Sequence, residues 1–308
     1  MGFEGVKRIW KSGEFMNWED CTTHVMSHGL HYGTGIFEGI RCYETKRGRA
    51  IFRLDAHLRR FSDSAGIYHM DLPYSRDELR DVIYELIKQN EFQDCYIRPL
   101  AYFGYNSLGV FPQGCPLEVV IGVWPWGAYL GEEGLEKGIK VMVSSWKKYN
   151  SSMMPTVGKA CGQYMNSYLC VSDARNKGYD EAIMLDSHGD VSEGSGENIF
   201  IVRGDNIYTN DPASSILLGI TRGSAIKIAE DLGYTVTIRK ISRGELYIAD
   251  EVFFTGTAAE VTPVIEIDNR PVGDGAKGKV TSAIQKRFFE IVKGERDDYD
   301  QWLDFVDA

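Results

Sequence analysis

The chain has 308 residues, of which 43% are hydrophobic and 25% are charged, a composition typical of a folded globular protein rather than a disordered one. This length is enough for two domains with separate cores. The 44 acidic residues outnumber the 34 basic ones and give a formal net charge of −10, which argues against nucleic acid as a partner.

No apolar run approaches the ~20 residues that a membrane-spanning helix needs. The N-terminus lacks the basic-then-apolar pattern of a signal peptide. The six cysteines contain no C-x-x-C pair, so we expect them to be reduced. Together these features predict a cytoplasmic protein with no membrane partner.

The first 125 residues are predicted to alternate strands with helices. Asp55 is a suitable N-cap for one helix. Ser75 and Glu78 form a capping box for the next, whose apolar residues recur at helical spacing from Leu79 to Ile87. The β-branched and aromatic content predicts strands over 95–103 and 117–124.

The second half begins after a glycine-rich stretch, residues 126–138, that we interpret as an interdomain linker. The predicted elements after it are a strand over 139–146, a helix that begins near Lys159, a strand over 181–185, a hairpin over 198–209, a helix from Thr221, a capping box at Ser242 and Glu245, a strand over 251–254 and a helix over 280–291. The sequence thus predicts a mixed α/β (α+β) fold with a small domain over 1–125 and a larger one over 139–308.

The segment Met153–Tyr168 holds one lysine in a constrained setting. Pro155 fixes its own φ, and Gly158 directly precedes Lys159. A nucleophilic lysine must lose its proton near neutral pH, and a confined apolar site lowers its pKa. On this segment alone, a surface lysine at a helix start is the better interpretation, although a helix N-terminus favours anions over cations. The choice between these interpretations depends on the rest of the chain.

Three histidines, His24, His28 and His31, lie close together in sequence. Their spacing does not match H-E-x-x-H, and no acidic third ligand is near them in sequence. We therefore predict no metal site. Hydrogen bonds that shape a loop are the better explanation.

Residues 191–200, VSEGSGENIF, place two carboxylates four residues apart beside two glycines. The segment lacks the lysine of a P-loop, and two glutamates would repel phosphate. It also lacks the G-x-G-x-x-G pattern of a dinucleotide site. A carboxylate partner for a cationic ring nitrogen fits Glu193 better.

Two further segments are candidate anion sites. Residues 218–222 lead into a helix N-terminus, whose free N–H groups attract anions, although an ordinary capped helix would have the same sequence. Residues 255–259 are small and follow a strand, as in a turn or a phosphate cradle. A reactive lysine, a buried glutamate, a phosphate site and an arginine together are what pyridoxal phosphate requires.

Six segments in this order resemble the class IV pyridoxal phosphate aminotransferases, and within that family the branched-chain amino acid aminotransferases: HVMSHGLHYGTGIFEGIR, YIRPL, GKACGQY, EGSGENIF, LGITR and FFTGTAAEVTP. The resemblance extends from about residue 8 to beyond residue 290. It implies a two-domain fold-type IV enzyme, similar to D-amino acid aminotransferase, with the cofactor in the cleft between the domains.

The resemblance also implies roles for individual residues. Lys159 would bind the cofactor covalently and move the substrate's Cα proton, Glu193 would pair with the pyridine nitrogen, and Tyr164 would bind the phenolate oxygen. Whether Glu197 acts directly or supports its neighbours stays open. The implied cofactor-binding residues are Arg60, Lys159, Tyr164, Glu193, Glu197, Ile220, Thr221, Gly256 and Thr257.

The implied substrate site is an aromatic pocket with one arginine at its edge. Arg98, with Tyr32 and Tyr129, would meet the distal carboxylate of glutamate, and the amides of Thr257 and Ala258 would bind the α-carboxylate. The full set is Tyr32, Phe37, Tyr96, Arg98, Trp126, Tyr129, Thr257 and Ala258.

The activity implied by the resemblance is reversible transfer of the amino group of L-leucine, L-isoleucine or L-valine to 2-oxoglutarate. Members of the family form homodimers or dimer-based hexamers, so we expect a homo-oligomer. A D-amino acid aminotransferase or an aminodeoxychorismate lyase of the same fold is the alternative. A catalytically silent oligomeric scaffold is a more remote one.

Overall fold

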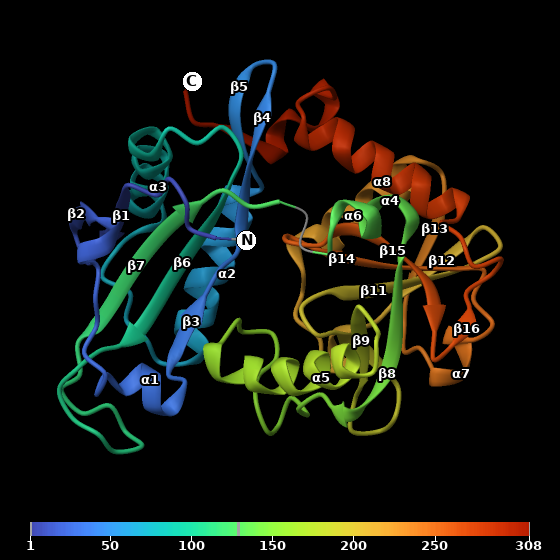
Figure 1. Cartoon of the computed structure of the whole chain (residues 1–308), viewed down its shortest axis with the longest axis horizontal. Helices are drawn as coiled ribbons and strands as arrows, with labels where there is room; N and C mark the ends of the chain where they lie inside the picture. Colours follow the sequence, from blue (N-terminus) through green and yellow to red (C-terminus); the bar gives the residue numbers. More distant parts are fainter. Residues whose placement is uncertain (1, 128–129, 308) are drawn as a thin grey trace. The chain divides into compact units, whose positions relative to one another are not determined.

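The computed structural model describes residues 2–127 and 130–307, and the chain divides into two compact units (Figure 1). The first unit comprises Met1–Gly127, Gly158–Gln163 and Ile291–Ala308; the second comprises Ala128–Val157 and Tyr164–Glu290. This division differs from the predicted one, because two segments of the predicted C-terminal domain, one of which contains Lys159, belong to the first unit. Among the helices that the structure describes, none is long and apolar enough to cross a bilayer.

The first unit is built on an antiparallel sheet. Its strands are β1 (Arg8–Lys11), β2 (Glu14–Asn17), β3 (Gly35–Phe37), β4 (Ile40–Thr45), β5 (Gly48–Phe52), β6 (Cys95–Phe103), β7 (Leu117–Trp124) and β17 (Leu303–Phe305). Their order is β17-β5-β4-β6-β7-β1-β2, with β3 beside β6.

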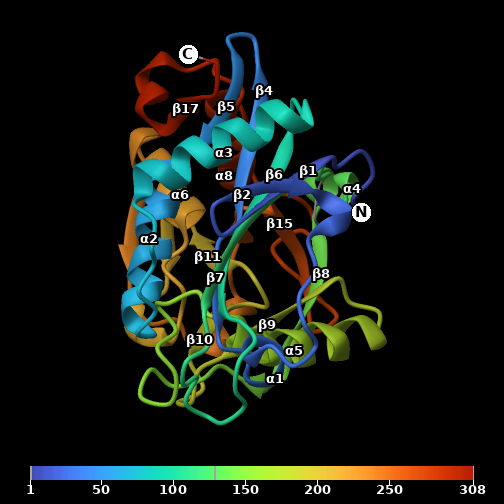
Figure 2. The ribbon, with the colours of Figure 1, turned by 90° about the vertical axis from the view of Figure 1, so that its left-hand side faces the viewer.

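Helices of the first unit cover this sheet. They are α1 (His28–Tyr32), α2 (Leu54–Ile67), α3 (Arg76–Asn90) and the 3₁₀ turns η1 (Trp18–Asp20), η2 (Cys161–Gln163) and η4 (Asp297–Trp302). Helix α3 packs on β1 and β7, while α2 contacts α3 and β3 (Figure 2). The pairing of β17 with β5 ties the C-terminal segment into this unit.

The second unit has a mixed sheet. Its strands are β8 (Ile139–Lys147), β9 (Glu181–Leu185), β10 (Val191–Gly194), β11 (Asn198–Arg203), β12 (Asn206–Thr209), β13 (Thr235–Ile238), β14 (Glu251–Gly256), β15 (Glu260–Ile267) and β16 (Arg270–Pro271). Their order is β10-β9-β8-β15-β14-β11-β12-β13, with β16 beside β15. The helices are α4 (Glu132–Lys137), α5 (Tyr164–Asn176), α6 (Ile220–Asp231), α7 (Arg243–Leu246), α8 (Lys279–Val292) and the 3₁₀ turn η3 (Pro212–Ser214).

Local sequence signals explain most of these elements. The capping box of α3 is present, since Ser75 Oγ accepts a hydrogen bond from the Glu78 amide at 3.2 Å and the Ser75 amide donates to Glu78 Oε2 at 2.7 Å. The capping box of α7 is confirmed too. The apolar side of α3 is fully buried at Leu79, Ile83 and Leu86, as its helical spacing predicts.

Two predicted helix starts are wrong. The N-cap of α2 is Arg53, at φ 56°, so Asp55 lies inside the first turn, where its charge still favours the helix dipole. Lys159 precedes the 3₁₀ turn η2, and the α-helix itself begins only at Tyr164. The lysine is therefore held by a loop and not by a helix.

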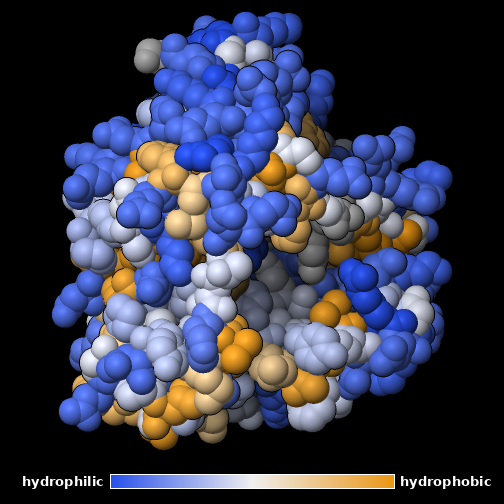
Figure 3. All heavy atoms as spheres, turned by 60° about the vertical axis from the view of Figure 1, so that its left-hand side comes forward, coloured by the Kyte–Doolittle hydropathy of each residue, from blue (hydrophilic) through white to orange (hydrophobic). Residues whose placement is uncertain are grey.

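Large apolar side chains are exposed on the first unit, next to α1 and in the loop between β6 and β7. We call this set the apolar loop patch: Val25, Leu30, Tyr105, Val110 and Phe111, which are 57–86% exposed. The two segments contact each other, because the rings of His24 and Tyr105 lie 4.3 Å apart. Figure 3 shows apolar side chains in several groups on one face of the molecule.

Candidate active site

Lys159 is held in the first unit between α2 and β3. Its amide donates to Ser64 Oγ at 3.0 Å, and its carbonyl accepts from the Phe37 amide at 3.0 Å. The preceding glycine permits this approach, since a Cβ at Gly158 would lie 2.8 Å from the ring of Tyr68. The backbone on both sides of the lysine side chain is thus fixed.

The Lys159 ammonium lies 4.8 Å from the centroid of the Phe37 ring. Burial, and then the positive charge of Arg60, lower the pKa of Lys159 to about 8, against the opposing effect of Glu38. At that pKa about a tenth of the side chains are neutral at pH 7. A neutral amine is what a nucleophilic lysine needs, so the structure favours the reactive interpretation of this residue.

A buried ion network stands beside Lys159. Arg60 donates to Glu38 from Nε to Oε1 at 2.7 Å and from Nη2 to Oε2 at 2.9 Å, and His57 Nδ1 lies 2.8 Å from Glu38 Oε2. Burial alone would raise the pKa of Glu38, but Arg60 and His57 hold it well below its usual range. The bidentate contact fixes the orientation of the Arg60 guanidinium.

Sequence reasoning missed Glu38 and His57. The available signal was the segment Ile36–Arg41, IFEGIR, in which one acidic residue interrupts an apolar strand sequence. A fully buried carboxylate without a cation is very costly, so that pattern alone predicts a partner. The partner is Arg60, 22 residues away.

Arg98 lies among aromatic rings. Its Cζ is 4.6 Å from the Phe37 centroid and 5.2 Å from that of Tyr96, and its Nη2 donates to the Tyr96 hydroxyl at 3.2 Å. Tyr96 stacks on Trp126, with the centroids 4.8 Å apart and the planes 27° apart. Gly39 leaves room for that hydroxyl, since a Cβ there would lie 1.9 Å from it.

We call these first-unit side chains the lysine group: Phe37, Glu38, Arg60, Tyr96, Arg98, Trp126 and Lys159. Two predicted substrate residues, Tyr32 and Tyr129, are not part of this group. Tyr32 ends α1 and is 45% exposed, and its ring is tilted by 35° to that of His28, with the centroids 4.6 Å apart. Tyr129 lies outside the described residues.

Each of the three clustered histidines has its own protein partner. His28 lies 2.7 Å from Thr34 Oγ1 and 2.6 Å from the Gly109 carbonyl. His24 accepts from the Met26 amide, and His31 contacts the Val25 carbonyl. The structure therefore supports the prediction that they shape a loop. In the described part of the chain, no group of His, Cys, Asp and Glu side chains could hold a metal ion.

Glu193, on β10 of the second unit, is only 5% exposed. Its Oε1 lies 2.6 Å from Lys148 Nζ. Its Oε2 accepts from Asn198 Nδ2 at 3.1 Å and from the Leu217 amide at 3.0 Å. Glu193 is thus buried, as expected, and is held by hydrogen bonds. Lys148 and Asn198 were not predicted.

Two other predicted residues, Glu197 and Tyr164, belong to the same unit as Glu193. Glu197 is 3% exposed, and its Oε2 accepts from the Gly196 amide at 3.0 Å, so it stiffens the turn between β10 and β11. Tyr164 is the first residue of α5 and interacts electrostatically with Lys148.

The first turn of α6 has the features of an anion site. Its N-cap is Gly219, which has no side chain. The N-cap residue therefore does not cover the amides of Ile220 and Thr221. A Cβ at Gly219 would lie 2.1 Å from Asn198 Oδ1, which explains why glycine is required there. The helix start thus adjoins the residue that binds Glu193.

The predicted cradle at 255–259 comprises the last two residues of β14, Thr255 and Gly256, and the turn to β15, which contains Thr257 and Ala258. Within the part of the chain that the structure describes, the buried hydroxyl of Thr255 has no hydrogen-bond partner. We call Lys148, Tyr164, Glu193, Glu197, Asn198, Ile220, Thr221 and residues 255–258 the carboxylate group.

These residues fit pyridoxal phosphate. The cofactor requires a lysine that can be neutral, and the pKa of Lys159 is lowered to about 8. It requires a carboxylate for its ring nitrogen, and Glu193 is buried and held. It requires an anion site, and the first turn of α6 in the second unit has the features of one.

Comparison with known proteins agrees with this chemistry. The family model for amino-transferase class IV matches residues 35–267. The chain is 46% identical to the branched-chain-amino-acid aminotransferase of Pseudomonas aeruginosa and 48% identical to that of Escherichia coli K12, covering 97% of each chain in both cases.

Solved structures are similar over almost the whole length. The crystal structure of the Escherichia coli branched-chain amino acid aminotransferase superimposes with a TM-score of 0.96 at 48% identity, covering 98% of this chain and 99% of that one. The T.th. branched-chain amino acid aminotransferase with pyridoxamine 5′-phosphate gives a TM-score of 0.94 at 48% identity, with the same coverage. The chain therefore belongs to the class IV aminotransferase family.

Proposed function

We propose that the protein is a pyridoxal phosphate-dependent branched-chain amino acid aminotransferase. It transfers the amino group of L-leucine, L-isoleucine or L-valine reversibly to 2-oxoglutarate. The observation that carries the choice of substrate is Arg98, whose half-buried guanidinium lies among the rings of Phe37 and Tyr96. The names of the similar proteins support the same choice.

Bound pyridoxal phosphate supplies an electron sink for negative charge at the substrate's Cα. We infer that each of the two units supplies residues of the kinds that this cofactor requires. Lys159 would hold the cofactor covalently and would move the substrate's Cα proton at its Nζ. Glu193 would hold the ring nitrogen, and Tyr164 would hold the phenolic oxygen.

The phosphate is assigned to the predicted donors, which are Arg60, the amides of Ile220 and Thr221, Gly256 and Thr257. Glu38 supports this role, because its bidentate contact holds Arg60 in one orientation. Glu197 is assigned a supporting role, because it holds the turn between β10 and β11 through the Gly196 amide.

The substrate site must accept an apolar side chain and a carboxylate in alternate half-reactions. Phe37, Tyr96 and Trp126 offer apolar surface to leucine, while Arg98 offers donors to the distal carboxylate of glutamate. Arg98 Nε is buried without a hydrogen-bond partner among the described residues, so it retains a donor for a ligand. Tyr32 and Tyr129 are proposed to complete this contact, and the Thr257 and Ala258 amides to bind the α-carboxylate.

The test is the visible absorption of the purified holoenzyme as one amino acid is added at a time. L-leucine, L-isoleucine, L-valine and L-glutamate are each expected to bleach the cofactor band, because each donates its amino group to the cofactor. D-alanine is expected to leave the band unchanged. A stopped-flow spectrophotometer gives the rate for each.

Other outcomes select the alternatives. Bleaching by D-alanine and not by L-leucine would assign a D-amino acid aminotransferase of the same fold. Bleaching by neither, with no uptake of added pyridoxal phosphate, would leave a catalytically silent scaffold.

The pH dependence of cofactor capture by the apoenzyme follows from Lys159. Because its pKa is about 8, the neutral fraction and hence the capture rate are expected to rise about tenfold between pH 7 and pH 9 and then level off. Folding stability should rise with pH between about 8 and 10.5, since the unfolded chain binds the extra proton there. A capture rate that is still climbing above pH 10 would mean an ordinary lysine.

We further propose a homodimer or a dimer-based hexamer that works in the cytoplasm. The apolar loop patch supports self-association, because exposed apolar side chains gathered together mark interaction surfaces. The free thiols of the six cysteines support a reducing compartment. Sedimentation of the purified protein gives the oligomeric state.

A further inference from the structure

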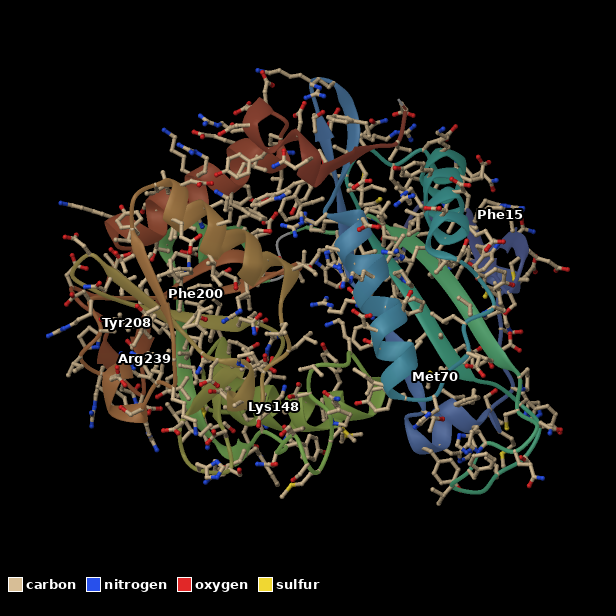
Figure 4. The ribbon with its side chains drawn as sticks, turned by 180° about the vertical axis from the view of Figure 1, so that it is seen from behind. Phe15, Met70, Lys148, Phe200, Tyr208 and Arg239 are labelled. Carbon is tan, nitrogen blue, oxygen red and sulfur yellow. The ribbon has the colours of Figure 1, made fainter. Side chains whose placement is uncertain are left out.

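Lys148 is a buried lysine to which the proposed mechanism gives no step. It follows β8 in the second unit, where Figure 4 labels it. Its amide donates to the Leu185 carbonyl at 2.8 Å, and the carbonyl of the preceding Lys147 accepts from Asn166 Nδ2 at 3.1 Å. The backbone is therefore held on both sides, and the side chain is only 9% exposed.

The Lys148 ammonium points at Glu193, with Nζ 2.6 Å from Oε1. The other titratable groups that interact with it are the Tyr164 hydroxyl and the thiol of Cys170, and burial raises the pKa of that thiol to about 11. Burial also acts to lower the pKa of Lys148, but the charge and hydrogen bond of Glu193 outweigh it, so the pKa is raised. Lys148 is therefore a cation at neutral pH.

The environment of Glu193 leaves one acceptor position. A carboxylate offers about four hydrogen-bond positions. Three are taken by described donors, namely Lys148 on Oε1 with Asn198 and the Leu217 amide on Oε2. Arg222 adds a second positive charge that interacts electrostatically with Glu193. The remaining position, on Oε1, suits one N–H donor.

We propose that Lys148 is a positioning residue that keeps Glu193 ionised and aimed before the cofactor arrives. The proposal deepens the proposed function and rests on it for the role of Glu193. A carboxylate buried this deeply gains a proton unless a cation stabilises its charge. A protonated Glu193 could not act as the anionic partner of a ring N–H, so Lys148 prepares the acceptor.

The test measures the protonation of Glu193 in the full-length apoenzyme by infrared spectroscopy, through the C=O band of a protonated carboxyl group. Wild type and Lys148→Arg, which keeps the charge, are expected to show no C=O band from Glu193. Lys148→Met, of similar shape but neutral, is expected to show one additional C=O band under the same conditions. The double variant Lys148→Met/Glu193→Gln assigns the band, which must vanish in it.

A Lys148→Met apoenzyme that shows no additional C=O band would overturn the proposal. So would an additional carboxyl band that persists in the double variant. Lys148→Gln provides a second neutral side chain should the methionine variant fail to fold, and its expected spectrum is the same. Failure of the proposed function is recognised separately, because wild-type protein would then not take up pyridoxal phosphate whatever the state of Glu193.

Discussion

Replacing Lys159 with alanine is expected to abolish turnover while the protein stays folded. The variant lacks both the covalent anchor and the base at Nζ, and the loss of acid–base catalysis alone removes about 10²- to 10⁴-fold in rate. The apoenzyme should not lose stability, because burial disfavours the charged lysine, as its lowered pKa shows. The rate is measured with L-leucine and 2-oxoglutarate under multiple turnover, and stability by thermal unfolding.

The controls separate the chemistry of Lys159 from its charge. Lys46→Ala removes a lysine of the same unit whose side chain is 89% exposed, and it should leave the rate unchanged. Lys159→Arg keeps a cation but has no amine that can be neutral near pH 8, so it should be as inactive as the alanine variant. A normal rate in Lys159→Ala would remove the assignment of this residue and of the reaction class with it.

The elements that the sequence predicts well are those decided by local chemistry. The capping boxes at Ser75 and Ser242 and the hairpin of β11 and β12 involve residues that are neighbours in the chain. The prediction of a helix start at Lys159 is wrong because it considered only the neighbours of Lys159 in the chain. Its loop is held by Ser64 and Phe37, which are distant in sequence, so that no pattern around Lys159 can reveal them.

The candidate site shows a similar division. The resemblance identifies residues by motif, and the structure then groups Lys159 with Arg60 and Phe37 in one unit and Glu193 with the start of α6 in the other. Neither motif nor periodicity indicates the ion-pair partners of these residues, such as Glu38 for Arg60 and Lys148 for Glu193. These ion pairs depend on which strands and helices pack together. The only signal in the sequence is a charged residue within an apolar segment, which predicts that a partner exists but not which residue it is.

Replacing Glu193 with glutamine is expected to lower both turnover and stability, and the Glu193–Lys148 pair allows the two losses to be measured separately. Glu193→Gln keeps the shape but removes the anion opposite the ring nitrogen, and turnover is expected to fall about 10²- to 10³-fold in this electrostatically controlled step. It also strands the Lys148 ammonium in a buried site, which should cost about 3–5 kcal/mol in the free energy of unfolding of the apoenzyme. Glu266→Gln, which breaks an ion pair with Lys140 that is more than half exposed on the lysine side, should change neither quantity appreciably.

Adding Lys148→Met to Glu193→Gln distinguishes the electronic effect from the structural one. The double variant has no stranded charge, so most of the lost stability should return, since a buried ion pair can be replaced by neutral groups at little cost. Turnover should stay low, because no carboxylate faces the ring nitrogen in either variant. If turnover recovers together with stability, the slow reaction of Glu193→Gln reflects a distorted site. A near-wild-type rate in Glu193→Gln itself would mean that a different group keeps the ring nitrogen protonated.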